Sequence, residues 1–155
     1  MNKTIFLGSD HGGFTLKEEI KKHLESKDLN YKDLGTYDSN SVNYVVYAKD
    51  VALSVAKFDG IGILCCSSGI GMSIAANKIV GVRAALCTSK FHAEFSRRHN
   101  NCNIICFGQK VSPTFDVFEM IDIFLSTPFD GGRHEMRVKS ISDVEFENIK
   151  NLHLV

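Results

Sequence analysis

The chain has 155 residues, 44% of them hydrophobic, and its 18 basic and 18 acidic residues give a formal net charge of zero. This length and composition predict one folded domain over residues 1–155 and exclude extensive disorder. The charge balance gives no reason to expect nucleic acid as a partner, and no apolar run approaches the roughly 18 residues that span a membrane.

The N-terminus and the cysteines predict a cytoplasmic protein. The apolar run near the N-terminus is shorter than the core of a signal peptide, and a Gly-Ser-Asp segment follows it at once. The five cysteines are an odd number and include no C-x-x-C pair, which argues against a zinc ribbon or a thioredoxin-type site. We expect reduced thiols, with Cys87, Cys102 and Cys106 in or near the core.

Short apolar runs alternate with amphipathic stretches along the chain. Strands that are apolar throughout are typical of a parallel sheet with both faces covered. The sequence therefore predicts an α/β fold of three layers, doubly wound and Rossmann-like, with a five-stranded parallel sheet and a C-terminal helix. In such sheets ligands bind at the carboxyl ends of the strands. Strands are predicted at 3–7, 29–34, 61–64, 82–87 and 103–107, and helices at 14–26, 44–57, 72–78, 89–98, 115–125 and 133–150.

Asp10 and His11 follow the first predicted strand, where the chain reads Gly-Ser-Asp-His-Gly-Gly. At the carboxyl end of a strand, these two side chains are candidates to bind hydroxyl groups or to transfer protons. The alternative is purely structural, an Asx turn followed by a helix cap.

A strand, a small polar turn and a helix follow one another within residues 60–81. Backbone N–H groups at the start of a helix can hold an anion or a developing oxyanion, and the helix dipole there favours a thiolate. Cys65 and Cys66 stand at the mouth of this turn, which runs from Ser67 to Gly71. Neighbouring strand residues point to opposite faces, so at most one of the two thiols faces the turn. The later position favours Cys66 without excluding Cys65.

The segment Arg97-Arg98-His99-Asn100-Asn101 ends a predicted helix. Basic residues complement the dipole at such an end, and Asn stops the helix, so a solvated C-terminus accounts for these residues. His99 is nevertheless a candidate acid or base, because the ordinary pKa of a histidine lies near neutrality.

Arg133 and Arg137 lie four residues apart at the start of the last predicted helix and therefore share one face. Two guanidinium groups on one face suit a phosphate or a carboxylate. The alternative is a solvated face in which Glu135 and Lys139 are their partners.

Taken together, these motifs resemble those of ribose-5-phosphate isomerase type B, in the sugar-phosphate isomerase family that also includes galactose-6-phosphate isomerase subunits. The resemblance covers nearly the whole chain, and the motifs follow the family's order and spacing. The matching segments are Gly-Ser-Asp-His-Gly-Gly-Phe at 8–14, Cys-Ser-Ser-Gly-Ile-Gly at 66–71, Ala-Ala-Asn-Lys at 75–78, Arg-Arg-His-Asn at 97–100 and Gly-Gly-Arg-His at 131–134.

The resemblance implies a sugar-phosphate isomerase without metal or cofactor, which interconverts D-ribose 5-phosphate and D-ribulose 5-phosphate through a cis-enediolate. It implies that Cys66 is the base that moves a proton between C1 and C2, and that His99, with Asp10 nearby, assists opening of the sugar ring. It also implies a homodimer or a tetramer with sites built from both subunits. The implied substrate-binding residues are Asp10, His11, Ser67, Ser68, Gly69, Ile70, Gly71, Asn100, Lys110, Arg133 and Arg137.

Two positions depart from the family pattern. Ser67 stands where the family usually has Gly after the cysteine, and Lys110 stands where it often has Arg. Lysine keeps the charge and loses the bidentate geometry. These departures leave an isomerase of a hexose 6-phosphate (allose or galactose) as an alternative. Two further alternatives rest on other features: a non-catalytic flavodoxin-like module would bind a phosphate of flavin or nucleotide at the strand-end turns, and a thiol redox sensor would use the cysteines.

Overall fold

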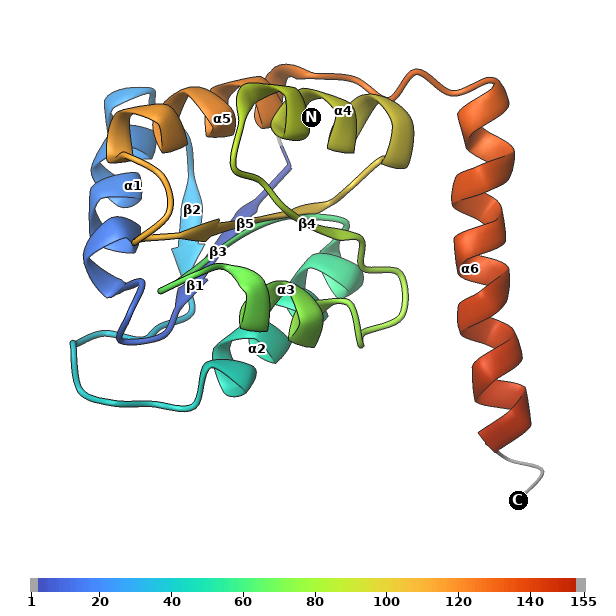
Figure 1. Ribbon diagram of the computed structural model, residues 1–155, viewed down its shortest axis with the longest axis horizontal. Helices are drawn as coiled ribbons and strands as arrows, with labels where there is room; N and C mark the ends of the chain where they lie inside the picture. The colour runs from blue at the N-terminus through green and yellow to red at the C-terminus, as the bar shows by residue number, and fades with distance from the viewer. Residues whose placement is uncertain (1–2, 153–155) are drawn as a thin grey trace.

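Five parallel strands form the sheet at the centre of the computed structural model, which describes residues 3–152 (Figure 1). The strand order is β2-β1-β3-β5-β4, so the chain winds outward on both sides of the boundary between β1 and β3. That boundary is the switch point at which doubly wound sheets bind ligands. The strands are β1 (Ile5–Ser9), β2 (Tyr31–Asp33), β3 (Ile61–Cys66), β4 (Ala84–Leu86) and β5 (Ile104–Gly108).

Helices cover both faces of the sheet and confirm the predicted three-layer α/β fold. Helices α1, α4 and α5 pack on one face, and α2 and α3 pack on the other (Figure 1). The alternation of side chains along β3 divides the core: Ile63 and Cys65 enter the first layer, while Leu64 and Cys66 enter the second. The helices are α1 (Phe14–Ser26), α2 (Tyr44–Phe58), α3 (Ile70–Ala76), α4 (Lys90–Asn100), α5 (Thr114–Ser126) and α6 (Arg133–Leu152).

Every predicted strand and helix has a counterpart, and the boundaries differ in ways that matter for the site. Strand β3 continues to Cys66 instead of ending at Leu64, because its last residues still pair with β1 and β5. Helix α4 continues to Asn100 and ends at Asn101, which has the left-handed φ of 47°. His99 and Asn100 are therefore helical residues.

The ends of the predicted domain, residues 1–2 and 153–155, lie outside the described residues. Within residues 3–152, no helix is both long enough and apolar enough to cross a bilayer. All five cysteines are buried and free, and the prediction of core thiols at Cys87, Cys102 and Cys106 is confirmed.

Helix α6 stands at the side of the molecule, beyond the end of α4 (Figure 1). The carboxylate of Glu145 accepts a hydrogen bond from the N–H of Gly81 at 3.0 Å. Ile141, Val144 and Phe146 remain 42%, 56% and 56% exposed. This helix therefore leaves much of its apolar surface without cover from its own chain.

Candidate active site

Cys66 ends β3 at the carboxyl edge of the sheet and is 6% exposed. Its Sγ accepts a hydrogen bond from the N–H of Gly69 at 3.0 Å. Gly69 has a left-handed φ of 79°, and an added Cβ there would lie 2.9 Å from the carbonyl carbon of Phe107. Only glycine fits this position, so the turn can place its N–H on the sulfur.

The turn also presents free backbone donors beside the thiol. The N–H groups of Ser68 and Gly71 make no hydrogen bond within residues 3–152. The N–H of Ile70 is used locally, because it donates to Oγ of Ser68 at 3.3 Å. Two free donors next to one thiol suit a developing negative charge on oxygen.

Cys65 points to the opposite face of the sheet and is 1% exposed. Burial raises the pKa of its thiol far above the ordinary value. Between the two neighbouring cysteines, the structure therefore places Cys66 at the turn and Cys65 in the core.

Asp10 lies in the loop between β1 and α1, which crosses the end of β3. Its N–H donates to the carbonyl of Cys65 at 3.2 Å, and its Oδ1 accepts the N–H of Gly13 at 3.0 Å. The carboxylate thus closes a turn, as the structural alternative predicted. Its other oxygen has no hydrogen-bond partner among the described residues, so Asp10 is also placed to receive a hydroxyl.

His11, Ser67 and Lys110 surround this edge. The exposed His11 accepts the N–H of Val42 at Nδ1, at 3.2 Å, so the neutral ring carries its proton on Nε2. The Oγ of Ser67 lies 2.2 Å from the place that a Cβ on Gly12 would take. Lys110 is exposed, and its N–H donates to the carbonyl of Ser67 at 3.1 Å.

The remaining predicted site residues lie at the other end of the sheet. Helix α4 runs back from the carboxyl edge, so His99 and Asn100 stand just before β5 begins at Ile104. Cys66 pairs with Gly108, the last residue of β5. The strand between them spans about 13 Å at the usual rise per residue. Within one chain, the structure does not bring His99 to Cys66.

His99 has three neighbours, which come from α6, from α4 and from the loop before α6. Its ring stacks on His134 with centroids 4.0 Å apart and planes at 10°, and it meets Phe95 edge-on at 4.8 Å. Its Nε2 lies 3.9 Å from the carboxylate of Asp130. That carboxylate also receives Nε–H of Arg98, at 3.2 Å.

Arg133 and Arg137 are exposed on α6, near this pair of rings. The Nε–H of Arg133 donates to Nε2 of His134 at 3.3 Å. Neither arginine forms an ion pair with Glu135 in the described part of the chain, so the predicted solvated network is not formed. Two guanidinium groups without a carboxylate partner suit a phosphate.

Three side chains of this corner, His99, Asp130 and His134, hold ligand-type atoms within 4.8 Å of one another, as a metal site would. Their geometry favours another interpretation. The two rings are almost parallel, Nε2 of His134 already accepts from Arg133, and Arg98 engages Asp130. Stacked rings do not direct two lone pairs at one point, so we interpret the cluster as a polar network.

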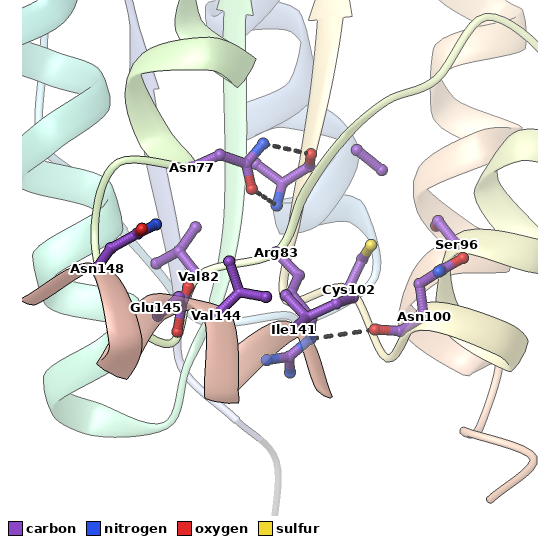
Figure 2. A pocket seen from close by; sticks show the side chains of 12 residues that line it. Asn77, Val82, Arg83, Ser96, Asn100, Cys102, Ile141, Val144, Glu145 and Asn148 are labelled. Atoms are coloured by element: carbon purple, nitrogen blue, oxygen red, sulfur yellow. Dashed lines mark hydrogen bonds between the residues drawn. The ribbon is translucent and has the colours of Figure 1, made fainter. Parts of the chain in front are cut away.

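A cleft of about 600 Å³ separates α6 from the end of the sheet that carries β4 (Figure 2). Ile141 and Val144 of α6 face Val82 across it, and Arg83 donates through Nε to the carbonyl of Asn100 at 3.1 Å. The cleft does not include Cys66. It marks the space that α6 leaves open beside its own subunit.

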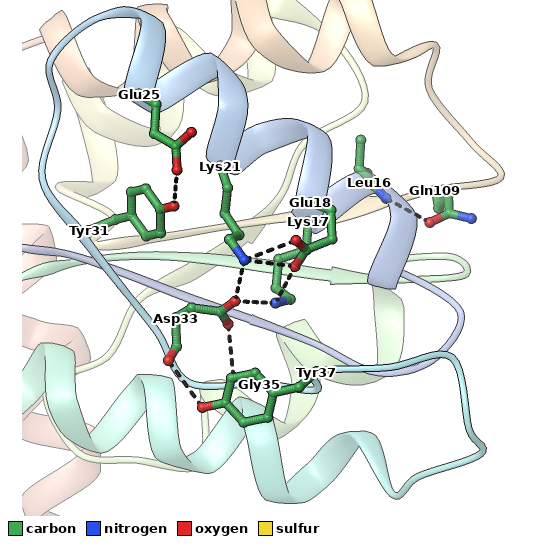
Figure 3. A network of polar contacts seen from close by, with 10 residues as sticks. All are labelled: Leu16, Lys17, Glu18, Lys21, Glu25, Tyr31, Asp33, Gly35, Tyr37 and Gln109. Atoms are coloured by element: carbon green, nitrogen blue, oxygen red, sulfur yellow. Dashed lines mark hydrogen bonds and ion pairs between the residues drawn. The ribbon is translucent and has the colours of Figure 1, made fainter.

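A buried ion pair between α1 and β2 was not indicated by the sequence. Lys17 is fully buried, and its Nζ lies 2.5 Å from Asp33 and 3.0 Å from Glu18, while Lys21 reaches the same Asp33 oxygen at 3.1 Å (Figure 3). Burial raises the pKa of Asp33, but hydrogen bonds from Lys17, the Gly35 N–H and Lys21 outweigh it and lower that pKa. The spacing of Glu18 and Lys21 indicates only a surface pair.

Known proteins and a family model match most of the chain. Residues 5–141 match the family model described as Ribose/Galactose Isomerase. The chain is 43% identical to ribose-5-phosphate isomerase B of Escherichia coli, over 92% of this chain and 97% of that protein.

Solved structures show the same fold. A ribose-5-phosphate isomerase B of Clostridium thermocellum superposes with a TM-score of 0.92 at 40% identity, over 94% of this chain and 99% of that one. The ribose-5-phosphate isomerase B of Mycoplasma genitalium, solved with bound ribulose-5-phosphate, superposes with a TM-score of 0.90 at 39% identity. The match covers 95% of this chain and 99% of that one.

Proposed function

The chain belongs to the ribose/galactose isomerase family, and on this premise we propose that it interconverts D-ribose 5-phosphate and D-ribulose 5-phosphate. It is an aldose–ketose isomerase. The observation that carries this conclusion is Cys66, a thiol next to free N–H donors in a chain whose similar proteins bear that enzyme's name.

In the proposed mechanism, Cys66 is the base. As thiolate it removes the proton from C2 of the open-chain aldose, and the electron pair of that C–H bond forms the C1–C2 double bond of a cis-enediolate. The N–H groups of Ser68 and Gly71 receive the negative oxygen. The proton of the O2 hydroxyl then passes to O1, and the thiol returns its proton to C1 as the C2 carbonyl forms, which yields the ketose. Asp10 and His11 bind the sugar hydroxyls that lie beside Cys66.

Ring opening and phosphate binding belong to the second group of residues. Ribose 5-phosphate is mainly a furanose, so a proton must pass from the C1 hydroxyl to the ring oxygen before isomerisation. His99 is the acid–base for this step, supported by Asp130 at 3.9 Å. Arg133 and Arg137 bind the phosphate; Asn100, next to His99, and Lys110, at the carboxyl edge, complete the binding set. Because the phosphate is remote from C1 and C2, its binding energy holds the sugar for the reaction.

The two groups work together only in an oligomer. We infer a homodimer in which Cys66 of one subunit and His99 of the partner subunit serve one substrate. The separation along β5 and the exposed apolar face of α6 support it.

We also propose that residues 1–155 form one isomerase domain in the cytoplasm. The family match over residues 5–141 supports the single domain, and five free cysteines suit a reducing compartment.

The decisive experiment measures ribulose 5-phosphate formation by the wild type, Cys66→Ala and Cys65→Ala. We expect Cys66→Ala to lose about 10²- to 10⁴-fold in kcat, the usual contribution of a positioned base. Cys65→Ala is the matched control, because its side chain lies in the core, and it should retain activity. A wild type without activity would contradict the function, whereas an active Cys66→Ala would contradict only the base.

Substrate preference needs its own comparison, because Ser67 and Lys110 depart from the family pattern. We expect kcat/KM to be highest for ribose 5-phosphate when allose 6-phosphate and galactose 6-phosphate are measured beside it. Ser67→Gly and Lys110→Arg restore the usual residues and show whether either departure changes that order.

A further inference from the structure

His134 is a buried side chain at the start of an otherwise exposed helical turn. It is 7% exposed, whereas its neighbours Arg133, Glu135 and Met136 are exposed. The mechanism above gives it no part. Its two contacts join both functional elements of this corner, since its ring stacks on His99 at 4.0 Å and its Nε2 accepts from Arg133 at 3.3 Å.

The hydrogen bond from Arg133 fixes the protonation of this ring. An Nε2 atom that accepts a hydrogen bond carries the lone pair, so the neutral ring holds its proton on Nδ1. Burial and the neighbouring His99, Arg133 and Arg137 lower the pKa of His134, and Asp130 opposes them only in part. A neutral ring avoids stacking one cation on another when His99 takes up a proton.

The same hydrogen bond orients Arg133. With Nε engaged by His134, the two terminal nitrogens of the guanidinium remain for a ligand. A phosphate needs two parallel N–H donors from one plane, and this arrangement presents them in one fixed direction. His134 therefore sets the direction of the phosphate clamp as well as the plane of the His99 ring.

We propose that His134 is a positioning residue that holds His99 and Arg133 at a fixed spacing, so that the ring oxygen and the phosphate of one sugar are engaged together. The inference rests on the proposed function. Its physical reason is that ring opening needs the proton donor aligned with a sugar whose other end is already held, and small misplacements are costly.

Two substitutions separate the two contacts. His134→Phe keeps a flat ring for stacking and loses the acceptor, so Arg133 is released. We expect KM to rise about 3- to 10-fold with kcat retained, the size of one lost hydrogen bond. His134→Gln keeps an acceptor oxygen and loses the stacked ring. We expect kcat to fall about 3- to 10-fold with KM retained, the size of one aromatic pair.

A second experiment does not depend on catalysis and measures the binding of inorganic phosphate by calorimetry. His134→Phe should weaken phosphate binding by the same factor as its KM, while His134→Gln should bind like the wild type. If the wild type binds phosphate and does not isomerise ribose 5-phosphate, the proposed function fails and the Arg133 part of this inference is still decided by the two variants.

Arg133→Lys provides a second test of the contact with Arg133 in case a His134 variant does not fold. Because lysine has no Nε–H fork, Arg133→Lys should raise KM alone, and its combination with His134→Phe should add little. An active wild type with equal kcat and KM losses in both His134 variants, or with none, would overturn the inference. So would fully additive effects of His134→Phe and Arg133→Lys on KM.

Discussion

The carboxyl edge of the sheet and the corner between α4 and α6 are built in different ways. At the edge, Cys66 and Asp10 are 6% and 8% exposed and are held by backbone contacts between β1, β3 and their loops. At the corner, His99 has a side chain that is 34% exposed, and Arg133 is exposed. The edge residues are therefore buried by their own chain, whereas His99 and Arg133 at the corner are open to solvent.

The edge is held together by close backbone contacts. A Cβ added to Gly13 would lie 2.3 Å from the carbonyl carbon of Cys65, so the loop carrying Asp10 lies directly on β3. The corner depends on side chains, through the stacked rings and the ion pair of Arg98 with Asp130. The edge residues are thus held by backbone contacts within one chain, whereas the corner residues are held by side-chain contacts and stay more exposed.

The largest effect is expected when variants of the edge and of the corner are combined in mixed dimers. Cys66→Ala and His99→Ala are each expected to be nearly inactive as homodimers. In a mixture of subunits, half of the sites in each mixed dimer regain both groups, so activity should return to roughly a quarter of the wild-type value. Activity is measured after mixing and subunit exchange, with light scattering to follow the dimer.

The matched control mixes Cys66→Ala with a Cys66→Ala/His99→Ala double variant, which contains no intact site in any pairing. No recovery in the first mixture, or full activity in a wild-type monomer, would contradict the shared site and leave the two regions without a common substrate.

The next effect tests the edge alone. Lys17→Met removes the buried cation beside Asp33 and should lower the free energy of unfolding by about 3 kcal/mol, at the low end for a broken buried pair because Lys21 remains. Urea unfolding with an unchanged m-value measures it. Lys22→Met, on the exposed side of α1, should change stability by less than about 0.5 kcal/mol. Equal effects would show that the ion pair contributes nothing.

The smallest effect is a difference in pH dependence. His134 has a lowered pKa, so its contribution is complete above the ordinary value of 6.5 and falls as the pH drops below it. Asp33 has a lowered pKa as well, so its contribution is lost only as the pH falls below 3.8. Amide hydrogen exchange at descending pH should therefore show the corner opening before the edge. Simultaneous opening would contradict the distinction between the two regions.

Sequence patterns predicted the architecture because each pattern has a local cause. Apolar runs divided by amphipathic stretches specify a covered parallel sheet, and this prediction is confirmed. The resemblance drawn from five short motifs is confirmed by the family match over residues 5–141. The roles of the individual site residues stay predictions.

Other features of the site were beyond sequence reasoning. Lys17 looks like a surface residue on a helix, yet it is buried, since Asp33 meets it from a strand sixteen positions away. His134 was part of a motif but received no role, because its partner His99 comes from another helix.

The sequence by itself determined the order of strands, turns and helices, and with it a thiol beside an anion-binding turn, because these depend on residues a few positions apart. Only the tertiary structure decided that Cys66 rather than Cys65 faces the turn, that Lys17 is buried, and that His99 lies at the far end of the sheet. Those outcomes depend on strand pairing and on the return path of α4, which join residues that no local pattern connects.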